Sequence, residues 1–322
     1  MKILVTAPYH REGLKDLETY FGEVVYKSWK PHGRAFNEDE LIRLLRETDA
    51  EALITEHDEV SQRVVENNSH LKFIGVCRGT PSNVSLETTK KYGIPVFNTP
   101  ARNAQAVAEL FVSNVIMLLR NTSAAMGWLE EGRWAEGSHT SYLQFKGNEL
   151  AGKTVGMVGF GAVGQRMANL IRHFPCQVIY FDPYIEKQQL YKSVGLEEVF
   201  SKSDIVSINL PAVESTRGMI DRKLFDLMKK DAVFVNMSRA VVVKREDLLE
   251  TLKSKQIRGA ILDVFDHEPP DELDYELIRL PSVLATPHIA GATHEVENHH
   301  VEIMNKVLFD HFVEENNLSQ KP

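Results

Sequence analysis

The sequence predicts an α/β protein with two doubly wound parallel-sheet domains, in which helices cover both faces of each sheet. Short apolar runs rich in Val and Ile alternate with amphipathic helical patterns along most of the chain, which is typical of parallel β-α-β units. The alternation forms two series, separated by a long apolar helical pattern at 104–120. The length of 322 residues allows about two domains, each with its own core.

The first series lies before residue 100. Its expected strands are Ile3–Thr6, Val24–Tyr26, Ala52–Thr55, Phe73–Cys77 and Pro95–Phe97. Helical patterns lie between these strands, and Asn37 with Glu40 forms a capping-box variant at the start of one of them. No glycine-rich phosphate-binding pattern follows the first strand, so we do not expect a nucleotide cofactor in this domain.

The helical pattern at 104–120 is too apolar to have one exposed face, which indicates a buried contact with a domain or a subunit. A glycine-punctuated stretch with four aromatic residues follows it: Trp128, Trp134, Tyr142 and Phe145. We interpret this stretch either as an arm that packs on a second subunit or as ordinary core packing. The first interpretation predicts a two-fold homodimer.

The second series contains enough strands for a complete dinucleotide-binding sheet. Its expected strands are Thr154–Val158, Val178–Phe181, Ile205–Asn209, Val233–Asn236, Gly259–Asp263 and Val283–Thr286. The last helical pattern, Glu295–Phe312, has no strand after it and is expected to return to the first domain. Residues 1–100 and 290–322 then form a discontinuous substrate-binding domain, and residues 101–289 form the inserted cofactor domain.

A glycine-rich motif follows the first strand of the second series and opens its first helical pattern. In Gly159-Phe160-Gly161-Ala162-Val163-Gly164 the first glycine permits a tight turn, the second lets the backbone approach a pyrophosphate, and the third allows close packing of helix on strand. The N-terminus of the helix offers N–H groups and a partial positive charge to the phosphates. Asp182, 18 residues after the last glycine (182 − 164), can bind both ribose hydroxyls and would repel a 2′-phosphate, so NAD is favoured over NADP.

Composition excludes several classes of partner. The net charge of −8 argues against a nucleic-acid surface and against an anionic membrane. No apolar run approaches the ~20 residues that span a bilayer, and the N-terminus is expected to be a strand rather than a signal peptide. Two cysteines, Cys77 and Cys176, form no disulfide framework and predict a reducing, cytoplasmic location.

Three polar residues that follow separate strands can supply the chemistry of hydride transfer. Ligands of open α/β sheets bind beyond the carboxyl ends of the strands, and Arg239, Glu268 and His288 all follow strands of the second series. Arg239 can bind a carboxylate and polarise a carbonyl with its planar fork. His288 can exchange a proton with the carbonyl oxygen, and Glu268 can orient the imidazole.

A metal site is not expected. His294, Glu295, His299 and His300 lie close together in the sequence, but only Glu295 and His299 share a helical face, at i and i+4. We interpret these residues as a solvated helix face, and Cys77 as a small buried residue at the end of a strand.

Seven motifs in order resemble those of the D-isomer-specific 2-hydroxyacid dehydrogenases, especially the D-3-phosphoglycerate dehydrogenase-like branch. The resemblance covers nearly the whole chain. The matching segments are Asn98-Thr99-Pro100 with Val107-Ala108-Glu109, Val158–Gly164, Phe181-Asp182-Pro183-Tyr184, Leu210-Pro211 with Thr216, Val235–Arg239, Leu262–Phe265 with Glu268-Pro269, and Thr286–Thr293. Because the sequence ends at Pro322, we expect no C-terminal regulatory domain like that of the longer phosphoglycerate dehydrogenases.

The resemblance implies a flavodoxin-like substrate domain, an inserted Rossmann NAD domain, and Arg239, Glu268 and His288 as the catalytic three. It implies that Asp263 contacts the nicotinamide carboxamide and that Leu210 and Pro211 border the adenine. The positions assigned to NAD are Gly159, Gly161, Ala162, Val163, Gly164, Asp182, Leu210, Pro211, Thr216, Met237, Ser238, Asp263 and Gly291.

The family also binds the substrate carboxylate with a loop after the fourth strand of the first domain. The matching segment here, 77–85, assigns Arg78 and Gly79 to the substrate, together with Arg239 and His288. This segment departs from the family pattern, because Ser82 and Ser85 replace two aspartates. Arg78 adds a positive charge that suits a second anionic group such as a phosphate.

We therefore expect an NAD-dependent oxidoreductase that interconverts a D-2-hydroxy acid, 3-phosphoglycerate-like or related, and its 2-oxo acid. One alternative is a glyoxylate or hydroxypyruvate reductase. Another is a catalytically silent, NAD-sensing interaction protein of the same fold. Formate oxidation is less favoured, because that branch uses Gln where Glu268 stands.

Overall fold

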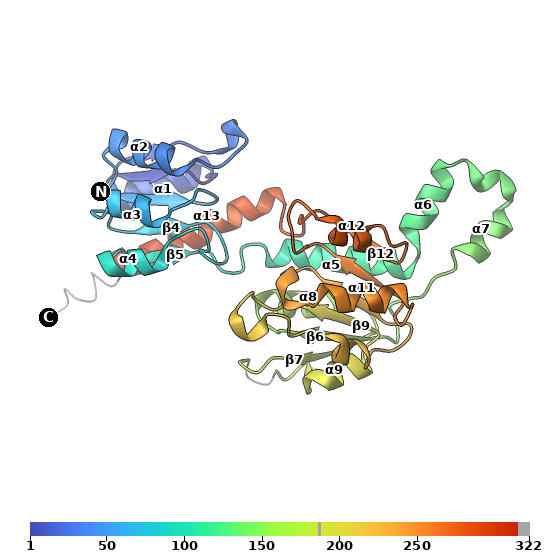
Figure 1. Ribbon diagram of the computed structural model, residues 1–322. Coiled ribbons are helices and arrows are strands. Elements are labelled where there is room, and N and C mark those ends of the chain that lie inside the picture. Colours follow the sequence, from blue (N-terminus) through green and yellow to red (C-terminus); the bar gives the residue numbers. More distant parts are fainter. Residues whose placement is uncertain (186–187, 315–322) are drawn as a thin grey trace. The chain divides into compact units, whose positions relative to one another are not determined.

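The computed structural model describes residues 1–185 and 188–314, and it divides into two compact units. One unit contains Met1–Asn103 together with the segment from Thr293 onward, and the other contains Ala104–Ala292 (Figure 1). The junctions expected from the sequence were 100/101 and 289/290, close to these positions. Both units contain a parallel sheet, so the predicted fold class is confirmed.

The first unit has a five-stranded parallel sheet in the order β2-β1-β3-β4-β5, the order of flavodoxin-like domains. Its strands are β1 (Ile3–Val5), β2 (Val24–Tyr26), β3 (Ala52–Thr55), β4 (Ile74–Val76) and β5 (Val96–Asn98). Its helices are α1 (Arg11–Phe21), the 3-10 turn η1 (Lys30–His32), α2 (Glu38–Thr48), α3 (Gln62–Asn67), α4 (Leu86–Tyr92), α13 (His294–Phe309) and the π-helical turn η5 (Asp310–Glu314).

Two apolar cores cover the two faces of this sheet. On one face α2 and α3 pack with Leu41, Leu45 and Val64, and on the other α1 and α13 pack with Leu17 and Met304. The expected capping box of α2 is confirmed, because the Glu40 N–H donates to Asn37 Oδ1 and the Asn37 N–H donates to Glu40 Oε2, each at 3.0 Å. The segment that follows the second unit thus supplies one of the helices that cover the first sheet.

The second unit has a seven-stranded parallel sheet in the order β12-β11-β10-β9-β6-β7-β8. Its strands are β6 (Thr154–Val158), β7 (Gln177–Phe181), β8 (Lys192–Ser193), β9 (Ile205–Ile208), β10 (Val233–Asn236), β11 (Gly259–Leu262) and β12 (Val283–Ala285). The strand order reverses between β6 and β9, and in open α/β sheets the ligand binds at this reversal. Strand β8 was not expected from the sequence, because its two residues are exposed and carry no apolar pattern.

Helices and short turns complete the second unit. They are α5 (Ala104–Leu119), α6 (Thr122–Glu130), η2 (Arg133–Glu136), α7 (Ser138–Gln144), α8 (Ala162–Ile171), α9 (Leu196–Lys202), η3 (Glu214–Thr216), α10 (Arg222–Phe225), η4 (Ala240–Val242), α11 (Arg245–Lys253) and α12 (Glu272–Ile278). None of the helices in the described part of the protein is long and apolar enough to cross a membrane.

The apolar helix α5 is buried within its own unit. Its side chains Val107, Phe111 and Val115 share a core with residues of the sheet and of α8. Beyond its end, α6 and α7 extend away from the seven-stranded sheet (Figure 1). In this arm Trp128 is buried and contacts Phe145 edge to face, whereas α7 leaves Tyr142 72% exposed.

Candidate active site

The glycine motif forms the turn between β6 and α8. Gly159 has a φ of +90°, and a Cβ there would lie 2.6 Å from the Asn209 carbonyl oxygen. A Cβ on Gly164 would lie 2.6 Å from the Gly159 carbonyl oxygen. Neither position can therefore hold a larger residue without moving the backbone. A Cβ on Gly161, the N-cap of α8, would meet nothing within 4 Å, so open space lies beside the helix N-terminus.

Asp182 lies at the end of β7 and is hydrogen bonded to the glycine turn. Its Oδ2 accepts from the Phe160 N–H at 2.7 Å, and its Oδ1 accepts from the Tyr184 N–H at 2.9 Å. These two bonds orient the carboxylate beside the open N-terminus of α8. The arrangement brings together the anion-binding turn and the acid that the sequence analysis assigned to the ribose.

Ala162 and Val163 begin α8, and most of the other residues assigned to the cofactor lie on the loops after β9, β10 and β12. The Thr216 hydroxyl donates to the Pro211 carbonyl at 2.6 Å and accepts from the Val213 N–H at 3.1 Å, so it closes its own turn. The Met237 side chain is buried in the core. The Ser238 hydroxyl donates to Asn236 Oδ1 at 3.0 Å. Leu210 and Gly291 are partly exposed on their loops.

Asp263 has a positioning role that the sequence analysis did not identify. This residue is fully buried at the end of β11. Its Oδ1 accepts from the Thr286 hydroxyl at 2.6 Å and from the Ile289 N–H at 2.9 Å, and its Oδ2 accepts from the Ala290 N–H at 2.9 Å. The carboxylate therefore holds the loop that carries His288.

The side chains of His288 and Glu268 contact each other directly. The His288 Nδ1 lies 2.7 Å from Glu268 Oε2, and the side chains are 49% and 42% exposed. Glu268 Oε1 also accepts from the Phe265 N–H at 3.3 Å. A carboxylate at Nδ1 selects the tautomer that carries a proton there and leaves Nε2 as the nitrogen that can exchange a proton with a ligand. His288 has a φ of +51°, a left-handed conformation that is uncommon for residues other than glycine.

Arg239 follows β10 and lines the same cavity as this pair. Its Nη1 donates to the Ser238 carbonyl at 2.7 Å, and its own carbonyl accepts from Asn236 Nδ2 at 3.0 Å. The cavity has a volume of about 620 Å³ and is lined by Arg239, Glu268 and His288, with Arg217, Lys244 and Arg245 among its other residues. Three strand ends thus bring an arginine, a glutamate and a histidine to one cavity of the second unit.

Arg78 and Gly79 belong to the first unit, in the loop after β4. The Arg78 carbonyl accepts from the Thr99 N–H at 2.9 Å, and the Gly79 carbonyl accepts from Asn98 Nδ2 at 2.7 Å. Just before this loop Cys77 is fully buried, and burial raises the pKa of its thiol well above the usual value. Such a thiol is structural rather than reactive.

Two of the three histidines of α13, His299 and His300, contact other residues of the first unit, whereas His294 is exposed. His300 is fully buried, its Nε2 donates to the Pro8 carbonyl at 2.7 Å, and its Nδ1 accepts from Arg102 Nη1 at 2.9 Å. Arg102 Nη1 also donates to Glu56 Oε1 at 2.6 Å. The expectation that His300 belongs to a solvated helix face is therefore wrong, because this residue is buried against Pro8 and Arg102. The ion pair of Arg102 with Glu56 was not expected from the sequence. His299 Nδ1 lies 3.0 Å from the Arg102 carbonyl oxygen.

Residues 112–290 match the family described as "D-isomer specific 2-hydroxyacid dehydrogenase, NAD binding domain". The protein is also 61% identical over 309 residues to a Bacillus subtilis (strain 168) protein that has the provisional name 2-hydroxyacid dehydrogenase YoaD, and the match covers 96% of this sequence and 90% of YoaD. The chain belongs to the D-isomer specific 2-hydroxyacid dehydrogenase family. The resemblance stated from its motifs is thereby confirmed.

Other relatives of this dehydrogenase have different names. It is 33% identical to the glyoxylate reductase of Thermococcus litoralis, over 95% of this sequence and 92% of the reductase. It is 33% identical to the D-3-phosphoglycerate dehydrogenase of Methanocaldococcus jannaschii, over 92% of this sequence but only 55% of that protein. Among solved structures, D-2-hydroxyisocaproate dehydrogenase superimposes with a TM-score of 0.83 and 25% identity over 98% of both proteins.

The dehydrogenase uses NAD, as its NAD-binding domain indicates. The residues of the second unit fit this cofactor. The open space at Gly161 can receive a diphosphate beside the N-terminus of α8, and the Asp182 carboxylate can accept hydrogen bonds from ribose hydroxyls. The comparisons leave the substrate unassigned, because the relatives' names differ among several 2-hydroxy and 2-oxo acids.

Proposed function

We propose that this dehydrogenase interconverts a D-2-hydroxy acid and its 2-oxo acid, with His288 as the acid–base group. The observation that carries this proposal is the 2.7 Å contact between His288 Nδ1 and Glu268 Oε2 in the cavity that Arg239 also lines. In the reducing direction His288 Nε2 donates a proton to the carbonyl oxygen of the oxo acid. The Glu268 carboxylate stabilises the positive charge that the ring carries before this transfer.

Arg239 binds the substrate carboxylate in this proposal. A guanidinium has five N–H donors, and the contact with the Ser238 carbonyl uses one of its terminal nitrogens, Nη1. A planar fork can hold a carboxylate with two parallel hydrogen bonds and still polarise the adjacent carbonyl. NAD, when bound, supplies the hydride chemistry.

For the substrate itself we favour a 3-phosphoglycerate-like acid. The positive charge of Arg78, in the loop after β4, supports an acid with a second anionic group. The alternative is glyoxylate or hydroxypyruvate reduction, which the match over 92% of the Thermococcus litoralis glyoxylate reductase supports. The match covers only 55% of the phosphoglycerate dehydrogenase, so it supports that activity less than a match over the whole length would.

A panel of 2-oxo acids tests the function and separates these substrates. NADH consumption is followed with 3-phosphohydroxypyruvate, hydroxypyruvate and glyoxylate, and kcat/KM is compared. A preference for the phosphorylated acid that disappears in Arg78→Met supports the first assignment. A preference for glyoxylate or hydroxypyruvate supports the alternative. NADH binding with no turnover on a broad panel of 2-oxo acids would instead favour an NAD-sensing protein.

The proposal also includes the oligomeric state and the location, which are a homodimer and the cytoplasm. The arm after α5 exposes apolar side chains, with Tyr142 72%, Leu143 71% and Trp134 56% exposed, and a second copy of the protein would cover them. The free thiols of Cys77 and Cys176 support a reducing compartment. Light scattering is expected to give twice the mass of one copy for the wild type, and monomers for Tyr142→Asp/Leu143→Asp. A wild-type protein that stays monomeric at micromolar concentrations would refute the dimer.

A further inference from the structure

The contact between Glu268 and His288 lies in a solvent-exposed part of the second unit. Both side chains are more than 40% exposed, so burial does not hold them in place. Exposed ion pairs contribute only about 0–1 kcal/mol, and part of that is lost to ordering the side chains. A 2.7 Å contact at this position therefore depends on how firmly the backbone around Glu268 is held.

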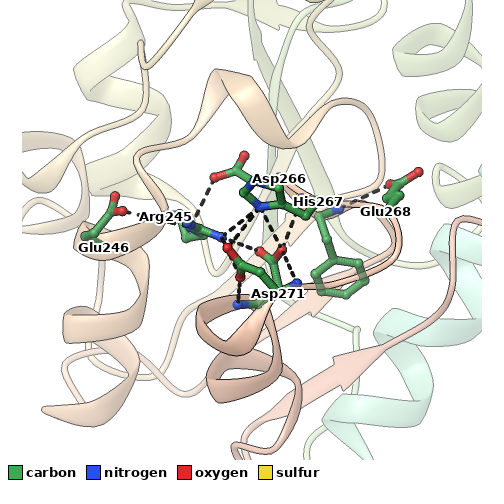
Figure 2. Close-up of polar contacts among 8 residues, drawn as sticks. Arg245, Glu246, Asp266, His267, Glu268 and Asp271 are labelled. Atoms are coloured by element: carbon green, nitrogen blue, oxygen red, sulfur yellow. Dashed lines mark hydrogen bonds and ion pairs between the residues drawn. The ribbon is translucent and has the colours of Figure 1, made fainter.

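Arg245 holds the segment on both sides of Glu268 (Figure 2). This residue begins α11, and its side chain is only 16% exposed. Its Nη1 donates to both carboxylate oxygens of Asp271 at 2.9 Å and to Asp274 Oδ1 at 3.0 Å. Its Nε lies 3.2 Å from Asp266 Oδ2, an ion-pair contact without hydrogen-bond geometry. Asp266 lies two residues before Glu268, and Asp271 lies three residues after it.

The carboxylates that Arg245 contacts are in turn hydrogen bonded to the backbone of this segment. Asp274 is 1% exposed, and its Oδ2 accepts from the His267 N–H at 3.1 Å and from the Asp271 N–H at 3.3 Å. Asp271 caps α12, because its Oδ1 accepts from the Asp274 N–H at 2.8 Å. The residue directly before Glu268 is thus attached to a buried acid that Arg245 neutralises.

The same acids resemble a metal site, but Arg245 takes the place of the cation. His267, Asp271 and Asp274 offer three ligand atoms within 4.8 Å of one another. Arg245 Nη1 is already hydrogen bonded to both carboxylates and lies 3.5 Å from His267 Nδ1. The backbone N–H of Asp274 lowers the pKa of Asp271 to about 2, and the Arg245 guanidinium acts in the same direction. Removing Arg245 would leave a buried carboxylate without its counter-charge.

We propose that Arg245 is a positioning residue for catalysis, which fixes the segment 264–271 and so holds Glu268 against His288. It contacts neither Glu268 nor His288, and it reaches them through Asp266, His267, Asp271 and Asp274. This inference rests on the proposed function of Glu268 and His288. It goes beyond that function because it assigns part of the turnover to a residue outside the reacting groups.

A double-mutant cycle with Arg245→Met and Glu268→Gln tests the inference. Misplacing a catalytic group by about 1 Å can cost roughly 100-fold, so we expect Arg245→Met to lower kcat by about 10- to 100-fold with little change in the Kd of NADH. In the Glu268→Gln background the same substitution is expected to cost less than about threefold, because the contact that it maintains is already gone. A merely structural role would give the same loss in both backgrounds, and that result would overturn the proposal.

Two further variants supply a control for the cycle and a replacement for Arg245→Met. Arg222→Met is the matched control, because Arg222 also bridges carboxylates, at 2.7 Å to Asp226 and 3.1 Å to Glu250, away from the Glu268 segment. Its kcat should equal that of the wild type. If Arg245→Met does not fold, Arg245→Lys replaces it in the cycle. Lysine keeps the charge without the fork, so an intermediate loss of kcat is expected, and it too should vanish in Glu268→Gln.

The cycle also separates the failure of this inference from the failure of the proposed function. If Glu268→Gln alone leaves kcat unchanged, the role of Glu268 is wrong and the inference falls with it. If Glu268→Gln lowers kcat while the loss from Arg245→Met is additive or absent, the proposed function stands and only the positioning role of Arg245 is refuted.

Discussion

Two histidines of this dehydrogenase, one in each unit, are both linked to a glutamate but in opposite surroundings. His288 is about half exposed and contacts the Glu268 carboxylate directly through Nδ1. His300 is fully buried, and a guanidinium, that of Arg102, stands between it and Glu56. An imidazole beside a carboxylate can carry a positive charge, whereas an imidazole beside a guanidinium must accept and stay neutral. The partner and the burial therefore decide which histidine is suited to proton exchange.

The hydrogen bonds of His300 and of His288 also serve different purposes. Both nitrogens of His300 are engaged, one with Arg102 and one with the Pro8 carbonyl, so this residue ties α13 to the loop after β1. His288 has one nitrogen bound to Glu268, and Nε2 has no hydrogen-bond partner among residues 1–185 and 188–314. The first arrangement suits packing and the second suits exchange with a ligand.

The largest expected effect tests this contrast directly. His288→Gln should lower kcat by roughly 10²- to 10⁴-fold, the usual contribution of a positioned acid–base group, with nearly unchanged NADH affinity. His300→Gln should leave kcat close to the wild-type value and lower the free energy of unfolding instead. Steady-state kinetics and urea denaturation of both variants check this. Near-normal turnover of His288→Gln would show that the assigned proton donor is wrong.

The second effect concerns Arg102 of the first unit, whose side chain is only 14% exposed. Arg102→Met leaves the Glu56 carboxylate, 7% exposed, without its counter-charge, and breaking such a buried pair costs about 3–5 kcal/mol. We expect a loss of this size in the free energy of unfolding, measured by urea denaturation. The exposed pair of Lys253 with Glu276 supplies the control, and Lys253→Met should change stability by less than about 1 kcal/mol. Equal losses in both variants would contradict the contrast between buried and exposed pairs.

Much of the cofactor region could be predicted because its signals are local. The turn at Gly159 and Gly164 needs residues without a Cβ, and the motif that contains them sits between an apolar strand and an amphipathic helix. The strand ends that carry Arg239 and His288 could likewise be predicted, because a parallel sheet places all its carboxyl ends on one edge. Such features need only a short window of sequence.

The positioning groups could not be predicted, because they depend on distant pairs. Arg102 meets Glu56 across 46 positions and His300 across 198. Arg245 meets Asp271 across 26 positions and Asp274 across 29, and nothing near Arg245 marks it as different from a surface arginine. The family resemblance assigned Asp263 to the nicotinamide carboxamide. Its hydrogen bonds to the loop of His288 could not be expected, because they depend on the register of β11 with β12.

The third effect is a pH dependence of stability that His300 introduces. Burial lowers the pKa of His300 below its usual value of 6.5, and Arg102 acts in the same direction, against the Pro8 carbonyl and the carboxylates of Glu56 and Glu297. Burial also lowers the pKa of His57 in this unit. The unfolded protein then binds more protons than the folded one below pH 6.5, so stability is complete above that pH and is lost as the pH falls towards the folded pKa.

Denaturation of the wild type and of His300→Gln at pH 8 and pH 5.5 measures this effect. Between pH 6.5 and pH 5.5 a histidine that stays neutral in the folded protein costs at most about 1.4 kcal/mol of stability, so the wild type should lose up to that amount for each of His57 and His300. His300→Gln should lose less, because one of the two histidines no longer titrates. An equal loss in both proteins would assign the acid sensitivity to other groups.

The smallest expected effect comes from removing one threonine hydroxyl in each unit. The Thr286 hydroxyl donates to Asp263 at 2.6 Å in the loop of His288, whereas the fully buried Thr99 hydroxyl has no partner among the described residues. Thr286→Val should therefore cost about 1 kcal/mol and lower kcat several-fold, because the carboxylate that holds the loop loses a donor. Thr99→Val removes an unsatisfied polar group at constant shape and should leave the free energy of unfolding unchanged or raise it slightly. If urea denaturation shows the two substitutions to be equally costly, then the hydrogen bond to Asp263 is not what sets the stability of the His288 loop.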